Sequence, residues 1–518
     1  MSALRKAKAA LIAYAANEQW QNTGGATPFQ PGALPCPDRD NDGIAEDHEF
    51  PQKPCDTPLK RIGRFPWQTI GADDLRDASG ESLWYAVSAG FLRNTPLYTN
   101  VINSDTLGQL TVDGSAPASN VVAIVFAPGE AIQGQVRSPA NLNDPASYLE
   151  QFDSLTYATF TSTGLLSAIN NDRLLVITQA DLMAVVEPIV AANIERDVKP
   201  LLQDYFTKWG SYPFAKTFVS PPVAQSSYLG TSLQTTGLLP VTNDTALLTW
   251  GPATVTDIVG SGTGIYDGTT NTISPNPTSC TIASSQATCT INYAGWRDDR
   301  PDLKIEITLN ASAAFADTPS MPAPDTLAMV DGDGVGLSDT DPGFGKWSAV
   351  GSPQNPPALS GFVLKVAGGV VTYTGRLQNA RDTKNQVTIT VPLPAPSYLP
   401  RLTNTSPTNP NITWFTSNQW YRQTYYAISL GFAPGGGGSC NPLPATPSCL
   451  TVNNLPAPKD NKRAILVFAG RALDGSARPS GNLANYLEGQ NSTPADFIYE
   501  HRAGTPTAIN DRVVVVSP

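Results

Sequence analysis

The sequence of 518 residues has little histidine, little charge and no long apolar run. It contains two histidines, His48 and His501, and no Cys-x-x-Cys spacing, which argues against a structural zinc site. The net charge is −11 and Lys and Arg do not cluster, so we expect neither nucleic acid nor an anionic membrane surface as a partner. No apolar run of about 20 residues occurs, so the sequence itself predicts no membrane-spanning helix.

Catalytic signatures are missing as well. The segment GSGTG at 260–264 does not have the G-x-S-x-G order of a nucleophile elbow. The cysteines fall in close pairs, which leaves no free thiol as a nucleophile. We therefore expect a protein that is not an enzyme. The alternative is a secreted enzyme such as a glycoside hydrolase, whose carboxylates the sequence does not single out among 44 Asp and Glu residues.

Turn-forming residues are abundant, with 46 Pro and 42 Gly. A hydrophobic content of 41% with 15% charged residues is typical of a globular protein, and so many turns favour β-rich segments over helical bundles. At roughly 150 residues per domain, the length predicts three or four domains.

The six cysteines form three close pairs along the chain, a pattern typical of sequential disulfides in an oxidising compartment. We therefore expect the protein to work outside the cytoplasm, in the periplasm or at the cell exterior. The expected disulfides are Cys36 with Cys55, Cys280 with Cys289, and Cys440 with Cys449.

A helix is predicted from Ala3 to Gln19, because Leu4, Ala7 and Leu11, followed by Tyr14, recur at helical spacing. The pattern starts without a capping residue. We expect that the native protein carries an apolar helical half ahead of it and that this chain is a soluble portion of a longer one. The alternative is a short surface helix.

An acidic loop lies between the first two cysteines. It matches the calcium-loop pattern D-x-D-x-D-G-x5-E, in which alternate carboxylates converge on one cation and Gly43 allows a sharp turn. Pro35 and Pro37 exclude the entering helix of an EF-hand. A metal-free turn held by Asp side chains is the alternative, and both stay open. The candidate calcium ligands are Asp38, Asp40, Asp42, the carbonyl of Ile44, and Glu49.

Four sequence blocks occur twice, in the same order and with spacings equal to within one residue, which indicates an internal duplication. Chance strands would not share the YLE and NDR blocks as well. The first set is YAVSAGF at 85–91, VVAIVFA at 121–127, YLE at 148–150 and NDR at 171–173, and the second is YAISLGF at 426–432, AILVFAG at 464–470, YLE at 486–488 and NDR at 510–512.

A second helix is predicted from Ala180 to Trp209, kinked or broken by Pro188 and Pro200. After it, an insertion of about 160 residues separates WGSYPFA from the second YAISLGF block. Alternating apolar residues at 303–309, 361–366 and 386–391 predict a β-sandwich within this insertion. Its acidic segment DGDGVGLSDTD at 331–341 lacks the calcium spacing and favours a plain surface loop.

The segments LPCPDRDNDGIAED, RFPWQTIG and DASGESLWYAVS resemble a family of type IV pilin-like proteins, which includes minor pilins and pseudopilins of type II secretion systems. The resemblance covers residues 3–91. The second copy resembles the family through VITQADLMAVVEPIV and WGSYPFA but lacks the cystine-bounded loop, and the insertion is not covered.

The resemblance implies an α+β fold of two tandem pilin-like modules, each with an N-terminal helix packed on an antiparallel sheet. We expect module 1 at 1–179, module 2 at 180–215 and 400–518, and an inserted β-sandwich-like domain at 216–399. The implied function is a non-enzymatic structural or adhesive subunit, a large minor pilin or pseudopilin near a filament tip.

The resemblance also implies partners and a location. Other pilin or pseudopilin subunits would bind through the N-terminal helix, and a surface receptor or glycan would bind the insertion. The native precursor would be anchored in the inner membrane before it joins a cell-surface filament. A carbohydrate-binding protein without a filament role is the alternative.

Overall fold

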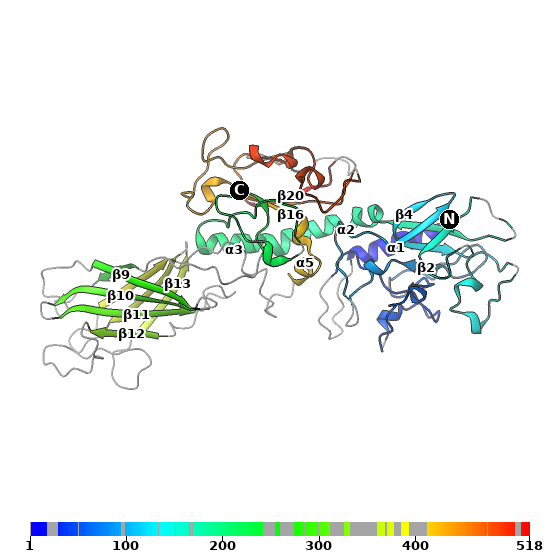
Figure 1. Ribbon diagram of the computed structural model, residues 1–518, viewed down its shortest axis with the longest axis horizontal. Helices are drawn as coiled ribbons and strands as arrows, with labels where there is room; N and C mark the ends of the chain where they lie inside the picture. The colour runs from blue at the N-terminus through cyan, green and yellow to red at the C-terminus, as the bar shows by residue number, and fades with distance from the viewer. Residues whose placement is uncertain are drawn as a thin grey trace.

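The computed structural model has a mixed α+β fold (Figure 1). For the strands between 254 and 392 it describes only the course of the backbone. It describes the chain from Ser2 to Pro518 except for residues 18–29, 50, 95–98, 133, 151, 165–166, 168, 223, 242–253, 260–273, 284–285, 298–299, 311–325, 332–359, 368–369, 378–384, 393–411, 474 and 503–508.

The first sheet is formed by strands whose order is β1-β2-β4-β3-β5, with β6 also paired to β4. The β3–β5 pair is parallel and the other pairs are antiparallel. β2 is buried on both faces, which explains its continuous apolar sequence. The strands are β1 Ile62–Arg64, β2 Trp84–Val87, β3 Leu110–Gly114, β4 Ala118–Ala127, β5 Thr159–Ser162 and β6 Arg173–Thr178.

Both faces of the first sheet carry a hydrophobic core. On one face the helix α1, Ser2–Asn17, buries Leu4, Ala7 and Leu11 against the sheet, which places the predicted helix and most of its stripe as expected. On the other face a smaller core forms around Trp84. Because neighbouring strand residues point to opposite faces, Tyr85 lies in the first core and Trp84 in the second.

The second sheet has the order β20-β18-β16-β7, all antiparallel. A separate short parallel pair is formed by β17, which precedes β18 in the chain, and β19, which follows β18. The helical turns α5, Thr413–Ser417, and η10, Trp420–Gln423, lead into β16. The strands are β7 Thr236–Leu238, β16 Thr424–Ile428, β17 Thr451–Asn453, β18 Ala464–Phe468, β19 Ile498–Glu500 and β20 Arg512–Ser517.

The two sheets correspond strand for strand, as expected from an internal duplication. The path β1-β2-β4-β6 has the same order and direction as β7-β16-β18-β20, and the parallel pair β3–β5 corresponds to β17–β19. The register also agrees. Tyr85 pairs with Val125, which pairs with Leu175, and in the other sheet Tyr426 pairs with Leu466, which pairs with Val514. We call residues 2–178 the first repeat, and residues 199–241 with 412–518 the second repeat.

A hydrogen bond across each repeat also has its counterpart in the other. The Tyr85 hydroxyl donates to the Pro35 carbonyl at 3.2 Å, and the Tyr426 hydroxyl donates to the Pro213 carbonyl at 3.1 Å. In each repeat, the backbone amide of the residue just before this proline donates a hydrogen bond to the short helical turn that follows the strand with the tyrosine. This turn is η3, Ala89–Phe91, in the first repeat and η11, Leu430–Phe432, in the second. The chain therefore leaves its helix and meets its sheet in the same way in both repeats.

A long helix joins the two repeats (Figure 1). It consists of α2, Gln179–Asn193, a π turn at Ile194–Val198, and α3, Lys199–Trp209, so it is interrupted as predicted but not broken. Thr178 caps its start in a reciprocal capping box with Asp181. The π turn inserts one residue, which rotates the apolar stripe by about 100°. As a result α2 packs on α1 and the first sheet, and α3 packs on β20.

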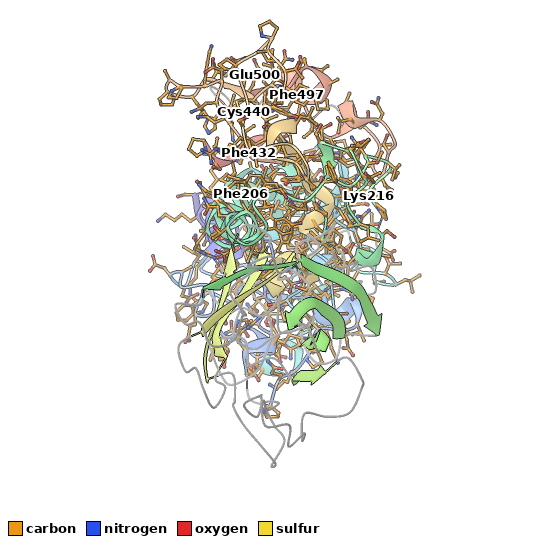
Figure 2. The ribbon with its side chains drawn as sticks, turned by 90° about the vertical axis from the view of Figure 1, so that its left-hand side faces the viewer. Phe206, Lys216, Phe432, Cys440, Phe497 and Glu500 are labelled. Atoms are coloured by element: carbon orange, nitrogen blue, oxygen red, sulfur yellow. A yellow bond between two sulfur atoms is a disulfide. The ribbon has the colours of Figure 1, made fainter. Side chains whose placement is uncertain are left out.

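α3 corresponds to α1, because each helix packs on the last strand of its own sheet. Lys8 on α1 donates to the Val176 carbonyl of β6 at 2.9 Å, and Gln203 on α3 donates to the Val516 carbonyl of β20 at 2.8 Å. Figure 2 shows Phe206 of α3 next to Phe432 in the core of the second repeat, where their ring centroids are 5.8 Å apart.

The inserted segment forms two four-stranded antiparallel sheets, which lie next to each other (Figure 1). Their orders are β12-β11-β10-β9 and β13-β14-β15-β8. The strands are β8 Thr254–Val259, β9 Ser274–Ala283, β10 Gln286–Arg297, β11 Arg300–Asn310, β12 Thr326–Asp331, β13 Ser360–Ala367, β14 Val370–Leu377 and β15 Asn385–Pro392.

The expected start of the insertion at residue 216 needs correction. β7 pairs with β16, Lys216 forms a β-bridge with Leu238, and Val241 is buried in the main core, so the chain up to 241 belongs to the second repeat. No sequence pattern predicts this strand, because β7 is only three residues long and contains Gly237. The acidic segment predicted at 331–341 lies outside the described residues after Asp331.

Candidate functional site

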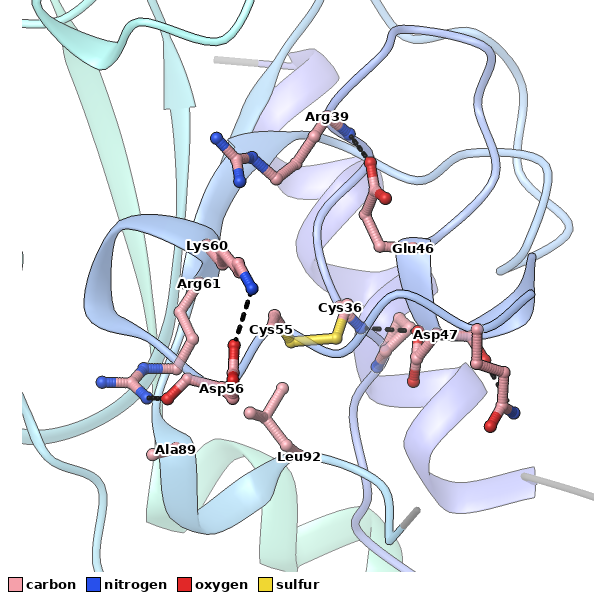
Figure 3. The surroundings of a disulfide bond; sticks show 12 residues. Cys36, Arg39, Glu46, Asp47, Cys55, Asp56, Lys60, Arg61, Ala89 and Leu92 are labelled. Carbon is pink, nitrogen blue, oxygen red and sulfur yellow. Dashed lines mark hydrogen bonds and ion pairs between the residues drawn. A yellow bond between two sulfur atoms is a disulfide. The ribbon is translucent and has the colours of Figure 1, made fainter. Parts of the chain in front are cut away.

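The predicted acidic loop is bounded by a disulfide between Cys36 and Cys55 (Figure 3). The backbone amide of Cys36 donates to the buried carboxylate of Asp47 at 3.0 Å, which fixes the loop at its first cysteine. The Cys440–Cys449 disulfide is also formed. Cys280 and Cys289 lie directly opposite each other on β9 and β10, but their side chains are outside the described part of the structure.

Asp38 holds the turn of the acidic loop from within. Its side chain is buried, and its two oxygens accept the backbone amides of Asn41 at 2.6 Å and Gly43 at 2.7 Å. Burial raises the pKa of Asp38 to about 6, against the opposing effect of these two amides. Gly43 has φ +88°, and a Cβ there would lie 2.6 Å from the Trp67 ring, so only glycine fits.

The carboxylates of the loop form two groups. Oxygens of Asp38, Asp40 and Asp42 lie within 4.8 Å of one another, and the same limit holds for Asp40, Glu46 and Glu49. The structure thus places Glu49, the expected closing ligand, in the second group. For Ile44 the structure records its backbone amide, which donates to Asp42 at 2.7 Å.

Lys53 offsets part of the negative charge of the second acidic group. Its ammonium forms an ion pair with Glu49 and lies 3.5 Å from Glu46 and 3.8 Å from Asp40. Its contact with Glu49 raises the pKa of Lys53 to about 12. A cation bound among these carboxylates would have to displace Lys53, whereas Asp40, with half of its side chain exposed, is free to turn toward Asp42. Oxygen donors of this kind fit a hard divalent cation.

Glu46 was not among the predicted ligands. Its side chain accepts the backbone amide of Arg39 at 3.1 Å, and burial raises its pKa. It occupies position 9 of the calcium loop counted from Asp38, which is a ligand position, but the motif D-x-D-x-D-G-x5-E leaves that position unspecified and so did not single it out. The neighbouring His48 links the loop to α1, because its Nε2 lies 3.1 Å from the hydroxyl of Tyr14.

A buried polar joint fixes the second repeat to the first. Glu187 on α2 is 3% exposed and forms an ion pair with Arg471 at 2.9 Å, while the Arg471 amide also donates to it at 2.6 Å. Ser104 of the first repeat donates to the same carboxylate at 3.0 Å. Burial raises the pKa of Glu187, and Arg471 opposes that shift. One carboxylate thus ties the connecting helix to both repeats.

Three more residues of the same first-repeat loop reach the second repeat. Asp105 accepts a hydrogen bond from Gln423 at 2.9 Å and pairs with Arg478 at 3.3 Å. The side-chain amide of Asn103 donates to the Asn418 carbonyl at 2.9 Å, and the Ile102 backbone amide donates to the Asn418 side chain at 3.3 Å. We call residues 102–105 with Glu187 and their partners the joint.

The joint could not be read from the sequence. The segment INSD at 102–105 looks like an ordinary polar turn, and its partners in the second repeat lie more than 300 residues away in the chain. Breaking it would leave Glu187 buried without its cation, which is strongly unfavourable. The two repeats are therefore held in one fixed orientation.

The disulfides indicate an oxidising, extracellular or periplasmic environment. Among the helices of the described chain, none is both long enough and apolar enough to span a bilayer. The predicted contacts of the insertion with a receptor or glycan fall on side chains outside the described residues. Comparisons with protein-family models, with curated proteins and with solved structures each found no match for this chain.

Proposed function

We propose that this chain is a non-enzymatic structural or adhesive subunit of a type IV pilus or type II secretion-like filament, in the role of a large minor pilin or pseudopilin. The observation that carries the proposal is the long helix formed by α2 and α3, which packs on the first sheet with one half and on the second with the other. Two helix-on-sheet units joined by one continuous helix suit a protein that is held in a filament and displays a domain.

The insertion supports a display role by its position. The chain leaves the second repeat after the buried Val241 and returns at the buried Ile412, so the inserted sheets are attached to a fixed core at both ends. Figure 1 shows these sheets at one end of the long axis and the first repeat at the other. A bulky domain in this place would clash in a repeated filament shaft, which favours a low-copy position near a tip.

Partner contacts follow from the same arrangement. α1 buries one stripe on the first sheet and leaves Arg5 and Lys6 exposed. Other pilin or pseudopilin subunits would bind at this helix, and a receptor or glycan would bind the insertion. Calcium in the loop of Asp38, Asp40 and Asp42 would stabilise the first repeat without taking part in binding.

The test is immunoelectron microscopy of the source cells with an antibody to the insertion, combined with the content of sheared filaments. We expect rare labels at filament ends and a few copies of the native protein in the filament fraction. Removal of residues 242–411 should abolish adhesion and spare incorporation. A native protein that appears only as free secreted monomer, with hydrolase activity toward a glycan, would replace the filament role by the enzyme alternative.

A further inference from the structure

The YLE and NDR blocks meet in both repeats, where each forms a pair of carboxyl groups. Glu150 of the first YLE lies against Asp172 of the first NDR, and Glu488 lies against Asp511 at the corresponding place in the second repeat. The proposed function uses neither pair. Paired acidic groups at corresponding places in both copies of a duplicated fold call for a chemical explanation.

In the first repeat the two carboxyl groups exchange hydrogen bonds with each other's backbone. The Glu150 amide donates to Asp172 Oδ2 at 2.5 Å. The amides of Asn171 and Asp172 donate to Glu150 Oε2 at 3.0 and 3.1 Å. Gln135 donates to the other oxygen of Glu150 at 2.6 Å. The pair thus joins the segment after Tyr148 to the start of β6.

The second repeat repeats this geometry. The Glu488 amide donates to Asp511 Oδ2 at 2.8 Å, and the Asn510 amide donates to Glu488 Oε2 at 3.1 Å. Asp511 is 0% exposed and also accepts a bond from the side-chain amide of Asn491 at 3.3 Å. Here the pair joins the segment after Tyr486 to the start of β20.

The cations near the pairs are engaged elsewhere. Arg137 donates to the Gly129 carbonyl at 2.6 Å and lies over the Tyr148 ring, and Arg478 donates to the Gly470 carbonyl at 2.6 Å and lies over the Tyr486 ring. Their ion pairs within 4 Å are made with Glu81 and Asp105. Arg137 and Arg478 act on the pairs only at longer range, where each favours the ionised form.

One oxygen of each aspartate has no partner among the described residues. Asp172 Oδ1 and Asp511 Oδ1 are both buried without a hydrogen bond. Two ionised carboxylates in contact repel each other, and burial removes the water that would weaken this repulsion. A single proton on the pair removes one charge and supplies a donor for the other carboxylate, as in other carboxyl dyads.

We propose that each pair, Glu150 with Asp172 and Glu488 with Asp511, holds one shared proton at neutral pH and works as a pH-sensitive latch. At high pH a hydroxide ion removes this proton and becomes water, which leaves two carboxylates in contact. Their repulsion separates the segment after Tyr148 from β6, or the segment after Tyr486 from β20. In the first repeat the freed strand is β6, which leads directly into α2, so the latch acts on the connecting helix.

The direction of the pH effect follows from the same contacts. Burial, and then the neighbouring Glu150 carboxylate, raise the pKa of Asp172 to about 9 in spite of the amide bond it accepts. Burial raises the pKa of Asp511 well above its ordinary range. A carboxyl group with a raised pKa in the folded state stabilises the fold fully below its ordinary pKa of about 4, and this contribution is lost as the pH rises toward the folded-state pKa.

The two latches differ in strength. Asp511 is completely buried, whereas Asp172 is partly exposed. The first repeat therefore opens at lower pH than the second. Opening starts at the beginning of β6 in the first repeat, rather than at the C-terminal strand β20.

Infrared spectroscopy of the whole chain at about pH 8 tests the proposal, because exposed carboxyl groups are ionised there. A carbonyl band of protonated carboxyl groups should be present in the wild type, lose half of its latch-dependent intensity in Asp172→Asn or Asp511→Asn, and lose all of it in the double variant. Asn mimics the protonated acid in shape and charge. The exposed Asp113→Asn variant is the control and should leave the band unchanged.

Thermal unfolding between about pH 5 and pH 9 is the second measurement, with the pH range set by the ordinary and raised pKa values. The wild-type midpoint should fall across this range, and the double Asn variant should lose most of that slope. An equal slope in both proteins would overturn the proposal. So would a wild-type band that is absent at about pH 8, because both carboxyl groups of each pair would then be ionised. The wild-type carboxyl band and the pH dependence of the wild-type melting midpoint test the proposal even if a variant does not fold.

Discussion

The first repeat carries the disulfide-bounded acidic loop ahead of β1, and the second repeat carries the long insertion between β7 and β16, which corresponds to the connection between β1 and β2. Each lies between the proline and the tyrosine that are joined by one hydrogen bond, over a chain separation of 50 residues in the first repeat and 213 in the second. The helix–sheet frame closes in the same way in both cases. The segment between the proline and the tyrosine therefore accepts additions of very different length, in line with the slow growth of loop-closure entropy with length.

The repeats also differ just after their second block. In the second repeat the side chain of Arg471 pairs with Glu187 in the joint and is 14% exposed, whereas its counterpart in the first repeat, Glu130, is exposed. The same turn thus serves as an internal contact in one copy and as free surface in the other. Substitutions at corresponding positions should separate the shared frame from what each repeat has added to it.

The largest effect should come from Arg471→Ala. Removing this cation leaves Glu187 buried and unpaired, which we expect to lower the free energy of unfolding by about 3 kcal/mol in urea titrations. Glu130→Ala at the corresponding exposed position should change it by less than about 0.5 kcal/mol. Equal effects at the two positions would mean that the joint does not hold the repeats together.

Removal of the two described disulfides should come next. The loop closed by Cys36 and Cys55 spans 19 residues and that closed by Cys440 and Cys449 spans 9. Replacing each pair by serine should cost about 3 kcal/mol in the first repeat and about 0.6 kcal/mol less in the second, because the shorter loop restrains the unfolded chain less. Urea denaturation without reductant measures both. A larger loss from the second pair would contradict this entropic ordering.

Calcium should act on one repeat only. If the acidic loop binds it, chelation should lower the melting temperature of the first repeat, by the equivalent of about 2.7 kcal/mol at a free calcium concentration 100 times the dissociation constant. Asp40→Ala should remove the difference between chelated and calcium-loaded protein, and Asp113→Ala should retain it. Identical melting curves with and without chelator would favour the metal-free turn held by Asp38.

The smallest expected losses of stability should be equal in the two repeats. Tyr85→Phe and Tyr426→Phe each remove one buried hydroxyl donor from a proline carbonyl, at a cost of about 1 kcal/mol in each repeat. Thermal or urea unfolding of the two variants gives the comparison. A clear loss in one repeat with none in the other would show that the two frames are not equivalent at this bond.

The sequence predicted the elements that carry a repeated pattern. Residues of the YLE and NDR blocks contact each other in both repeats. These shared contacts account for the residue types and the spacing that the two repeats have in common. The main strands followed from their apolar runs, and the helix ahead of the loop followed from Leu4, Ala7 and Leu11. The two described disulfides agree with the expected pairing of neighbouring cysteines.

The sequence could not predict elements whose partners lie far away in the chain. β7 has three residues and no alternation, and its pairing with β16 fixed it in the second repeat. Glu46 stands at position 9 of the calcium loop, which the motif leaves unspecified, and its place in the acidic group became clear only from the fold of the loop. Asn103 and Asp105 resemble any polar turn until the second repeat is placed against them. Polar contacts of this kind leave no periodic trace in a single sequence.

The central claim is that the joint holds the two repeats in one orientation while the insertion is carried outside them. Spin labels at the exposed positions Asp113 and Lys459, introduced as non-natural amino acids so that the cysteines stay paired, allow a pulsed electron paramagnetic resonance distance measurement between the repeats. We predict one narrow distance distribution that is unchanged when residues 242–411 are replaced by a short linker and broadened by Arg471→Ala. A broad distribution in the unaltered chain would contradict the account.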